Sequence, residues 1–233
     1  MVAVDELDKL LEEKFTSTFR KGYVVINGFT FPKRYQELKE EFDNLEVDEE
    51  DVWICSFPKS DAKLQIIYVA RDPKDTCISY YHHSKLMEGF TGDFGEFCEL
   101  FLAGKVNFGP YWGHVLPFWE IRNSPNFLFL KYEDMKSNLG KVIKQVSEFL
   151  ERPLGDEQIE ILTKHLSFES MKANPAVNYE MVCDLNKRFK LIEHEGVFMR
   201  SGTVGGYKAV MSPEVIERFD EWIKENTQGT DYF

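Results

Sequence analysis

The chain has few cysteines, and none of them is spaced for a metal site. Four cysteines occur among 233 residues, and no two of them form a C-x-x-C pair. This spacing argues against the common zinc motifs. Widely separated cysteines in apolar surroundings are typical of reduced core residues, so we expect a cytoplasmic protein with no metal. The four are Cys55, Cys77, Cys98 and Cys183.

Positive charge and long apolar runs are also scarce. The net charge is −12 and the pI is about 5.0, which argues against a nucleic-acid partner or an anionic membrane surface. No apolar run approaches the length of a membrane span, and the N-terminus MVAVDELDKL is too acidic and polar for a signal peptide. An anion site in such a chain has to be built locally, from a few basic side chains and backbone N–H groups.

The residues that are present fit one globular domain over 1–233. Hydrophobic residues make up 43% of the chain and aromatic residues 15%, enough for a core at this length. No repeat, low-complexity tract or long linker divides it. Near the N-terminus we expect a helix over 4–15, a hairpin turning at Asn27-Gly28, and a charged helix over 32–45.

The chain is organised around the stretch LQIIYVARDPKDTCISYYHH. Gln65–Ala70 is an apolar, β-branched run, which is typical of a strand buried on both faces. Arg71 follows where the run ends, and Asp72-Pro73 forms a good N-cap and first helical residue. Ligands of open α/β sheets bind beyond the carboxyl ends of the strands, where an arginine beside a helix N-terminus suits an anion. Taken alone, the stretch would by default be interpreted as a surface arginine paired with Asp75, but other stretches of the chain point the same way as the anion site.

Two further apolar runs, Val52–Phe57 and Asn126–Tyr132, predict other strands of the same sheet. Helical periodicity predicts the helices that flank it, over 93–103, 108–121, 139–150 and 156–166. The second of these carries an aromatic stripe, which we assign to the core. The pattern indicates an α/β fold with a parallel sheet flanked by helices.

VARDPKD followed by SYYH resembles the cytosolic sulfotransferase family. Members of this family transfer a sulfuryl group from 3′-phosphoadenosine 5′-phosphosulfate (PAPS) to an alcohol, phenol or amine. The stretches KYED, SFESMK and FMRSGTVGGY agree with the family in order and spacing, so the resemblance covers most of the chain from Asp51 onward. It implies a P-loop-like sheet of the sulfotransferase type, PAPS as the sulfuryl donor, and a small-molecule acceptor.

The resemblance also implies which residues hold the donor. Lys59 would stabilise charge between the sulfuryl group and the leaving phosphate, as the only expected catalytic residue. Arg71, Ser79 and Arg200 would hold the 3′-phosphate, and Tyr132 would lie near the adenine, although a strand-end tyrosine with a wet hydroxyl explains it equally well. The expected donor-binding residues are Lys59, Ser60, Arg71, Ser79, Tyr132, Ser167, Phe168, Met199, Arg200, Ser201 and Gly202.

The chain departs from the family after Ser60. Where the family has Pro-Lys-Ser-Gly-Thr-Thr-Trp, this chain has PKSDAKL, and everything up to the YVAR strand is absent, including the Lys-Thr-His stretch with the catalytic histidine. Only seven residues separate Phe57 from Gln65, whereas parallel neighbours normally need a crossover of a dozen or more. An antiparallel hairpin fits this length but moves Arg71 to the sheet end opposite Lys59. We therefore expect an internally truncated domain whose sequence is inconsistent at this point with a well-formed fold.

The histidines offer no counterpart to the missing base. His82 and His83 lie near Ser79, but His82 matches an ordinary histidine of the family and is a poor substitute. The other three have no supporting sequence neighbours, and we expect them on the surface: His114, His165 and His194.

Three hypotheses about function remain. The first is a PAPS-dependent sulfotransferase of little or no turnover, in which Ser201 replaces a family lysine and weakens anion binding. The second is a non-catalytic remnant or splice product that binds PAPS or adenosine 3′,5′-bisphosphate (PAP). The third, a P-loop nucleotide kinase, is disfavoured because G-x-x-x-x-G-K-[ST] is absent. A homodimer through Lys208–Glu217 also stays open, because Ser212-Pro213 replaces the Thr-Val of the family's dimer motif.

Overall fold

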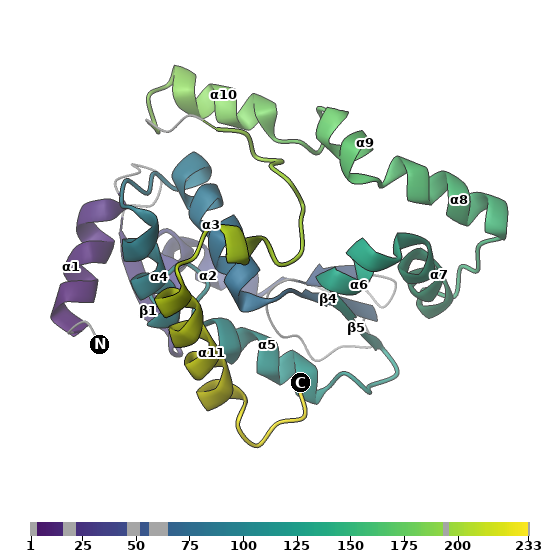
Figure 1. Cartoon of the computed structure of the whole chain (residues 1–233), viewed down its shortest axis with the longest axis horizontal. Helices are drawn as coiled ribbons and strands as arrows, with labels where there is room; N and C mark the ends of the chain where they lie inside the picture. Colours follow the sequence, from purple (N-terminus) through teal and green to yellow (C-terminus); the bar gives the residue numbers. More distant parts are fainter. Residues whose placement is uncertain (1–3, 16–21, 46–51, 56–64, 193–195, 233) are drawn as a thin grey trace.

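A parallel sheet of three strands lies at the centre of the part of the chain that the structure describes (Figure 1). The computed structural model describes residues 4–15, 22–45, 52–55, 65–192 and 196–232. The strands are β3 (Val52–Cys55), β4 (Gln65–Ala70) and β5 (Phe127–Lys131), in the order β3-β4-β5. Both neighbouring pairs are parallel. The expected α/β class, with a parallel sheet flanked by helices, is confirmed.

The parallel pairing of β3 with β4 corrects the argument from link length. Val52 pairs with Gln65 and Cys55 with Tyr68. Because β3 is so short, the chain has to return only about 10 Å along the sheet and cross one strand spacing of about 4.8 Å. The residues between the strands, 56–64, can reach roughly 30 Å when extended. The expected conflict therefore does not arise, and the link itself lies outside the described residues.

Strand β4 is buried on both faces, as its apolar sequence predicts. One face packs on α5 (Tyr111–Glu120), whose aromatic stripe forms a core cluster with the strands. The cluster contains Ile66, Tyr68, Ala70, Trp112, Val115, Phe118, Phe127 and Tyr232. The other face presents Ile67 to α7 (Leu139–Phe149), where it packs with Leu130 and Val142. The assignment of the aromatic stripe to the core is confirmed.

A second core joins helices from both ends of the chain. The helices are α1 (Val4–Lys14), α3 (Pro73–Met87), α4 (Phe94–Leu102) and α11 (Pro213–Thr227). Their buried side chains include Leu7, Leu11, Cys77, Phe97, Cys98, Phe101 and Phe219. Cys77, Cys98 and Cys183 are free and buried, which fits the expected reduced core cysteines, whereas the Cys55 side chain lies outside the description.

The expected hairpin is also present. Strands β1 (Tyr23–Ile26) and β2 (Phe29–Pro32) pair antiparallel, and α2 (Tyr35–Asp43) follows them. Asn27 and Gly28 form the turn with φ of 52° and 81°, the left-handed conformation that a two-residue hairpin requires.

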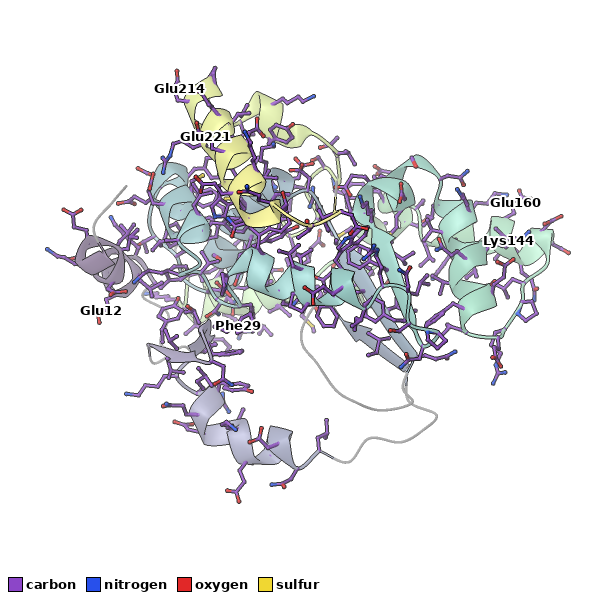
Figure 2. All side chains as sticks on the ribbon, turned by 90° about the horizontal axis from the view of Figure 1, so that it is seen from below. Glu12, Phe29, Lys144, Glu160, Glu214 and Glu221 are labelled. Atoms are coloured by element: carbon purple, nitrogen blue, oxygen red, sulfur yellow. The ribbon has the colours of Figure 1, made fainter. Side chains whose placement is uncertain are left out.

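The remaining elements lie along one edge of the molecule and then return to its centre (Figure 1). They are α6 (Tyr132–Ser137), α8 (Asp156–His165), α9 (Phe168–Ala173), α10 (Glu180–Arg188) and the short 3₁₀ helix η1 (Gly206–Ala209). After α10 the chain crosses back to α3, against which η1 packs. Charged side chains such as Glu12, Glu160 and Glu214 project from the periphery (Figure 2). None of the helices in the described ranges is long and apolar enough to cross a membrane.

Candidate functional site

A cavity of about 850 Å³ lies at the carboxyl end of β4. Its walls come from the end of β4, one face of α3, helix α5 and the segment before it, the start of α6, helix α9 (Phe168–Ala173) and the loop that follows α10. Helix α3 contributes Asp75, Thr76, Ser79, His82 and His83 to the lining. Residues three and four positions apart share one face of a helix, so the sequence of α3 alone brings these side chains together.

Asp72 fixes the start of α3 beside the cavity. Its side chain accepts hydrogen bonds from the backbone N–H groups of Lys74 and Asp75, and Pro73 occupies the first turn. This is the expected N-cap, and it places Arg71 at the junction between β4 and α3. The Tyr111 hydroxyl of α5 donates to the backbone carbonyl of Arg71, which holds this junction in place from the other side.

Arg71 links three parts of the cavity wall. Its guanidinium lies 4.4 Å from the centre of the Tyr132 ring, and its Nη2 donates to the Thr203 carbonyl at 3.2 Å. Within the described ranges its buried Nε has no hydrogen-bond partner. A buried guanidinium N–H without a partner is costly, and an anion in the cavity is the kind of acceptor that would satisfy it.

Arg200 brings a second guanidinium to the same cavity. Burial, and then the neighbouring positive charge of Arg71, lower the pKa of Arg200 from its ordinary value. The positive charge of Arg71 thus disfavours that of Arg200, and an anion between them would relieve the repulsion. The cavity is electropositive at this end even though the whole chain is acidic.

The loop that carries Arg200 is anchored by a residue that the sequence did not reveal. The buried carboxylate of Asp75 accepts hydrogen bonds from the backbone N–H groups of Gly205 at 2.6 Å and Tyr207 at 3.0 Å. The alternative of a simple Arg71–Asp75 surface pair does not hold, because the Asp75 carboxylate faces the loop. The available signal was a carboxylate in the first turn of a helix whose N-terminus faces a glycine-rich stretch.

Gly202 and Phe168 pack directly against each other. Gly202 has φ of 59° and a Cβ there would come within 2.7 Å of the Phe168 ring, so glycine is required both by conformation and by space. The Tyr132 hydroxyl donates to the Gly202 carbonyl at 3.2 Å. The ammonium of Lys136 lies 5.3 Å from the centre of the Phe168 ring.

The structure brings most of the expected donor-binding residues together and separates one from the rest. Those that line the cavity are Arg71, Ser79, Tyr132, Phe168, Met199, Arg200, Ser201 and Gly202. Ser167 is not among the residues that line the cavity. Its hydroxyl caps α9 by accepting a hydrogen bond from the Ser170 N–H at 3.2 Å. Lys59 and Ser60 lie outside the described residues.

His114 is a correction to the sequence analysis. We expected it on the surface, but it is only 7% exposed on α5 and lines the cavity. Its Nδ1 lies 2.6 Å from the Tyr68 hydroxyl, and burial lowers its pKa to about 4. The error arose because its neighbour comes from β4, far away in sequence. His165 is exposed on α8 as expected, and His194 lies outside the described residues.

The described side chains include no group of three or more His, Cys, Asp or Glu that could hold a metal ion. The residues that line the cavity offer binding of an anion by paired guanidinium groups, hydroxyls and a glycine loop, beside an aromatic region.

Comparison with known proteins agrees with this chemistry. The sulfotransferase domain model matches residues 53–231. Luciferin sulfotransferase of Photinus pyralis is 49% identical over 170 residues, which cover 73% of this chain and 46% of that protein. Sulfotransferase 1A1 of Mus musculus is 37% identical over 175 residues, covering 74% of this chain and 58% of that protein.

Solved structures show the same relationship. Retinol dehydratase in complex with androsterone and the inactive cofactor PAP has a TM-score of 0.68 and 34% identity, covering 73% of this chain and 49% of that one. A mouse sulfotransferase complexed with PAP has a TM-score of 0.73, covering 90% of this chain and 95% of that one, and at 24% identity it supports the fold alone.

The chain belongs to the sulfotransferase family. It spans about half the length of the curated relatives it matches.

Proposed function

We propose that this chain binds PAPS and its product PAP in the cavity, as a member of the family that transfers a sulfuryl group to a hydroxyl or amine of a small acceptor. The observation that carries the proposal is the pair Arg71 and Arg200, two guanidinium groups in one cavity, of which the first has a buried N–H with no partner in the described chain. The residues fit a phosphate group held beside an aromatic surface. The printed names of the related proteins, and the PAP in related structures, support the same ligand.

The donor-binding roles follow from chemistry and position. Arg71, Arg200 and the Ser79 hydroxyl would hold the 3′-phosphate, because guanidinium groups grip phosphate through two parallel hydrogen bonds. Backbone N–H groups of the loop around Gly202 and the Ser201 hydroxyl would add donors. Phe168, Met199 and the ring of Tyr132 offer apolar surface for the base.

This chain retains fewer of the groups that sulfuryl transfer requires than the family has. Sulfuryl transfer requires positive charge where it develops on the leaving phosphate, a proton acceptor, and a scaffold that aligns both reactants. Lys59 is the proposed cation, and the family's base-bearing Lys-Thr-His stretch is absent from the sequence. We therefore propose binding with weak or no turnover. Membership in the sulfotransferase family argues against the nucleotide kinase hypothesis.

Calorimetric titration of PAP into the whole chain tests the binding site. The expected result is measurable binding, which Arg71→Ala and Arg200→Ala each weaken by about tenfold to a hundredfold, since one charged hydrogen bond contributes about 1.5–3 kcal/mol. Arg188→Ala is the matched control, because Arg188 is exposed on α10. PAP affinity that is unchanged in the first two variants, or equally reduced in the third, would contradict the assignment.

A further inference from the structure

An asparagine in the cavity wall has one side-chain amide atom with a partner and the other without. Asn107, in the segment before α5, lines the cavity and is only 4% exposed. Its Nδ2 donates to Glu88 Oε1 at 3.2 Å, whereas its buried Oδ1 has no hydrogen-bond partner within the described ranges. A buried carbonyl oxygen without a partner is costly, so a hydrogen-bond donor on the occupant of the cavity would remove that cost.

The surroundings of Asn107 fix which way its amide points. Glu88 is buried, and its carboxylate also accepts a hydrogen bond from the Ser84 hydroxyl at 2.8 Å. Turning the amide over would place Oδ1 against this carboxylate, and two acceptors repel each other. The Tyr80 hydroxyl lies at hydrogen-bond distance both from the carboxylate, at 3.3 Å, and from the Asn107 backbone carbonyl, at 3.0 Å. Oδ1 is therefore an acceptor whose position is set before a ligand binds.

Asn107 contacts the end of α3 that is opposite to Arg71. Arg71 comes just before α3, and Glu88 directly follows it. The 15 residues of the helix separate its two ends by about 22 Å, at a rise of about 1.5 Å per residue. The sequence neighbours of Asn107, Val106 and Phe108, are apolar and also line the cavity. This part of the cavity suits the small molecule that receives the sulfuryl group rather than the phosphates of the donor.

We propose that Asn107 selects substrates that carry a second hydrogen-bond donor, apart from the group that receives the sulfuryl group. This inference rests on the proposed function. Asn107 Oδ1 accepts a hydrogen bond from the second donor, and Glu88 is a positioning residue that holds the amide. Because Oδ1 is buried in the wall, a small donor such as a hydroxyl reaches it more readily than a bulky group. Asn107 thus determines specificity and takes no part in proton transfer.

Calorimetry with matched phenols tests this selection. One pair is 4-(hydroxymethyl)phenol and 4-ethylphenol, and the other carries the same two substituents on 4-hydroxybiphenyl, which is one ring longer. Within a pair the substituents are similar in size, and only the hydroxymethyl group carries a donor. Each compound is titrated into the whole chain with and without PAP. In at least one pair, Asn107→Leu should lower the affinity ratio of the hydroxymethyl to the ethyl compound by about threefold to tenfold, as expected for one neutral hydrogen bond. A purely structural role would weaken both compounds alike and leave this ratio unchanged.

Ser84→Ala is the matched control, because Ser84 is buried and donates to the same carboxylate but is not among the residues that line the cavity. It should leave the ratio unchanged. A ratio that is unchanged in Asn107→Leu for both pairs, or lowered to the same degree in Ser84→Ala, overturns the inference, as does a wild-type chain that binds none of the four phenols. PAP binding is measured separately on each variant, so failure of the donor site is visible independently. If Asn107→Leu fails to fold by circular dichroism, Asn107→Ala decides the outcome.

Discussion

Asp75 shows how a single side chain can couple a helix to a loop that lines the cavity. It lies in the first turn of α3 and receives two backbone N–H groups of the loop from Gly205 to Tyr207. An asparagine there keeps the shape but offers one oxygen acceptor, and its amide N–H groups oppose the second loop donor. The loop that presents Arg200 would then be held less firmly.

Limited trypsin digestion tests this coupling, because Arg200 is a cleavage point in the loop. Asp75→Asn should speed cleavage after Arg200 by about tenfold, which corresponds to the loss of one charged hydrogen bond. Asp184→Asn serves as the control, because Asp184 is exposed on α10. An unchanged rate at Arg200 would show that the loop is held by other contacts.

His114 should make the folded state sensitive to acid. Its pKa is about 4 when folded against an ordinary value of 6.5, so between these pH values the unfolded chain binds the extra proton. Stability is therefore fully present above about pH 6.5 and is lost as pH falls toward 4, by an amount on the order of 2–3 kcal/mol.

Urea unfolding at pH 7 and pH 5 measures this effect. His114→Gln should lose less stability between the two pH values than the wild-type chain, whereas the exposed His165→Gln should lose as much as the wild type. Equal pH sensitivity in all three proteins would place the acid-sensitive group elsewhere.

At the scale of elements, local patterns predicted most of the fold. The 3.6-residue periodicity predicted α7 and α8. The pair Asn27-Gly28 predicted the hairpin turn, and Asp72-Pro73 predicted the start of α3. Each of these signals comes from residues that are close in sequence. The pattern also placed the expected anion ligands at the end of β4, because the carboxyl end of a parallel strand is where ligands of such sheets bind.

The parts that sequence could not predict all depend on distant contacts. His114 is buried because α5 packs across Tyr68 of β4, and Ser167 caps a helix although its sequence context matches a ligand motif. The parallel pairing of β3 with β4 was obscured because the extent of β3, which sets the distance that the link must cover, is not visible in its sequence.

The packing of α5 on the sheet can be tested directly. Phe118 is 4% exposed, and its ring stacks on Tyr68 and Phe127 with centroids 4.5 Å and 5.8 Å apart. Phe118→Ala should lower the free energy of unfolding by about 3–5 kcal/mol, because it removes buried area and leaves a cavity. Glu120→Ala, exposed on the same helix, should change it by less than about 0.5 kcal/mol in the same urea titration. Similar losses in both variants would contradict the packing described.

At the scale of the whole molecule, the chain combines a cavity lined by the proposed donor-binding residues with the sequence gap after Ser60. Arg71, Ser79, Arg200 and Gly202 converge on one cavity, although the chain spans about half the length of the curated relatives it matches. We interpret the gap as an internal truncation that removes donor-aligning residues and the family's base. The coding transcript can test its origin, since an in-frame skipped exon after Ser60 would indicate a longer sibling product.

Turnover by this chain should be at least about a hundredfold lower than in the same chain with the missing family segment restored. The physical reason is alignment: a misplacement of about 1 Å can cost roughly a hundredfold. The absence of the family's base adds a further loss of up to about 10⁴-fold, although the two losses need not multiply. Labelled PAPS assayed at saturating concentration with each protein, against phenols, alcohols and amines, measures the difference. Saturation removes the effect of weaker binding, so comparable turnover by the two would mean that Lys59 and the residues around the cavity align the donor without the longer loop.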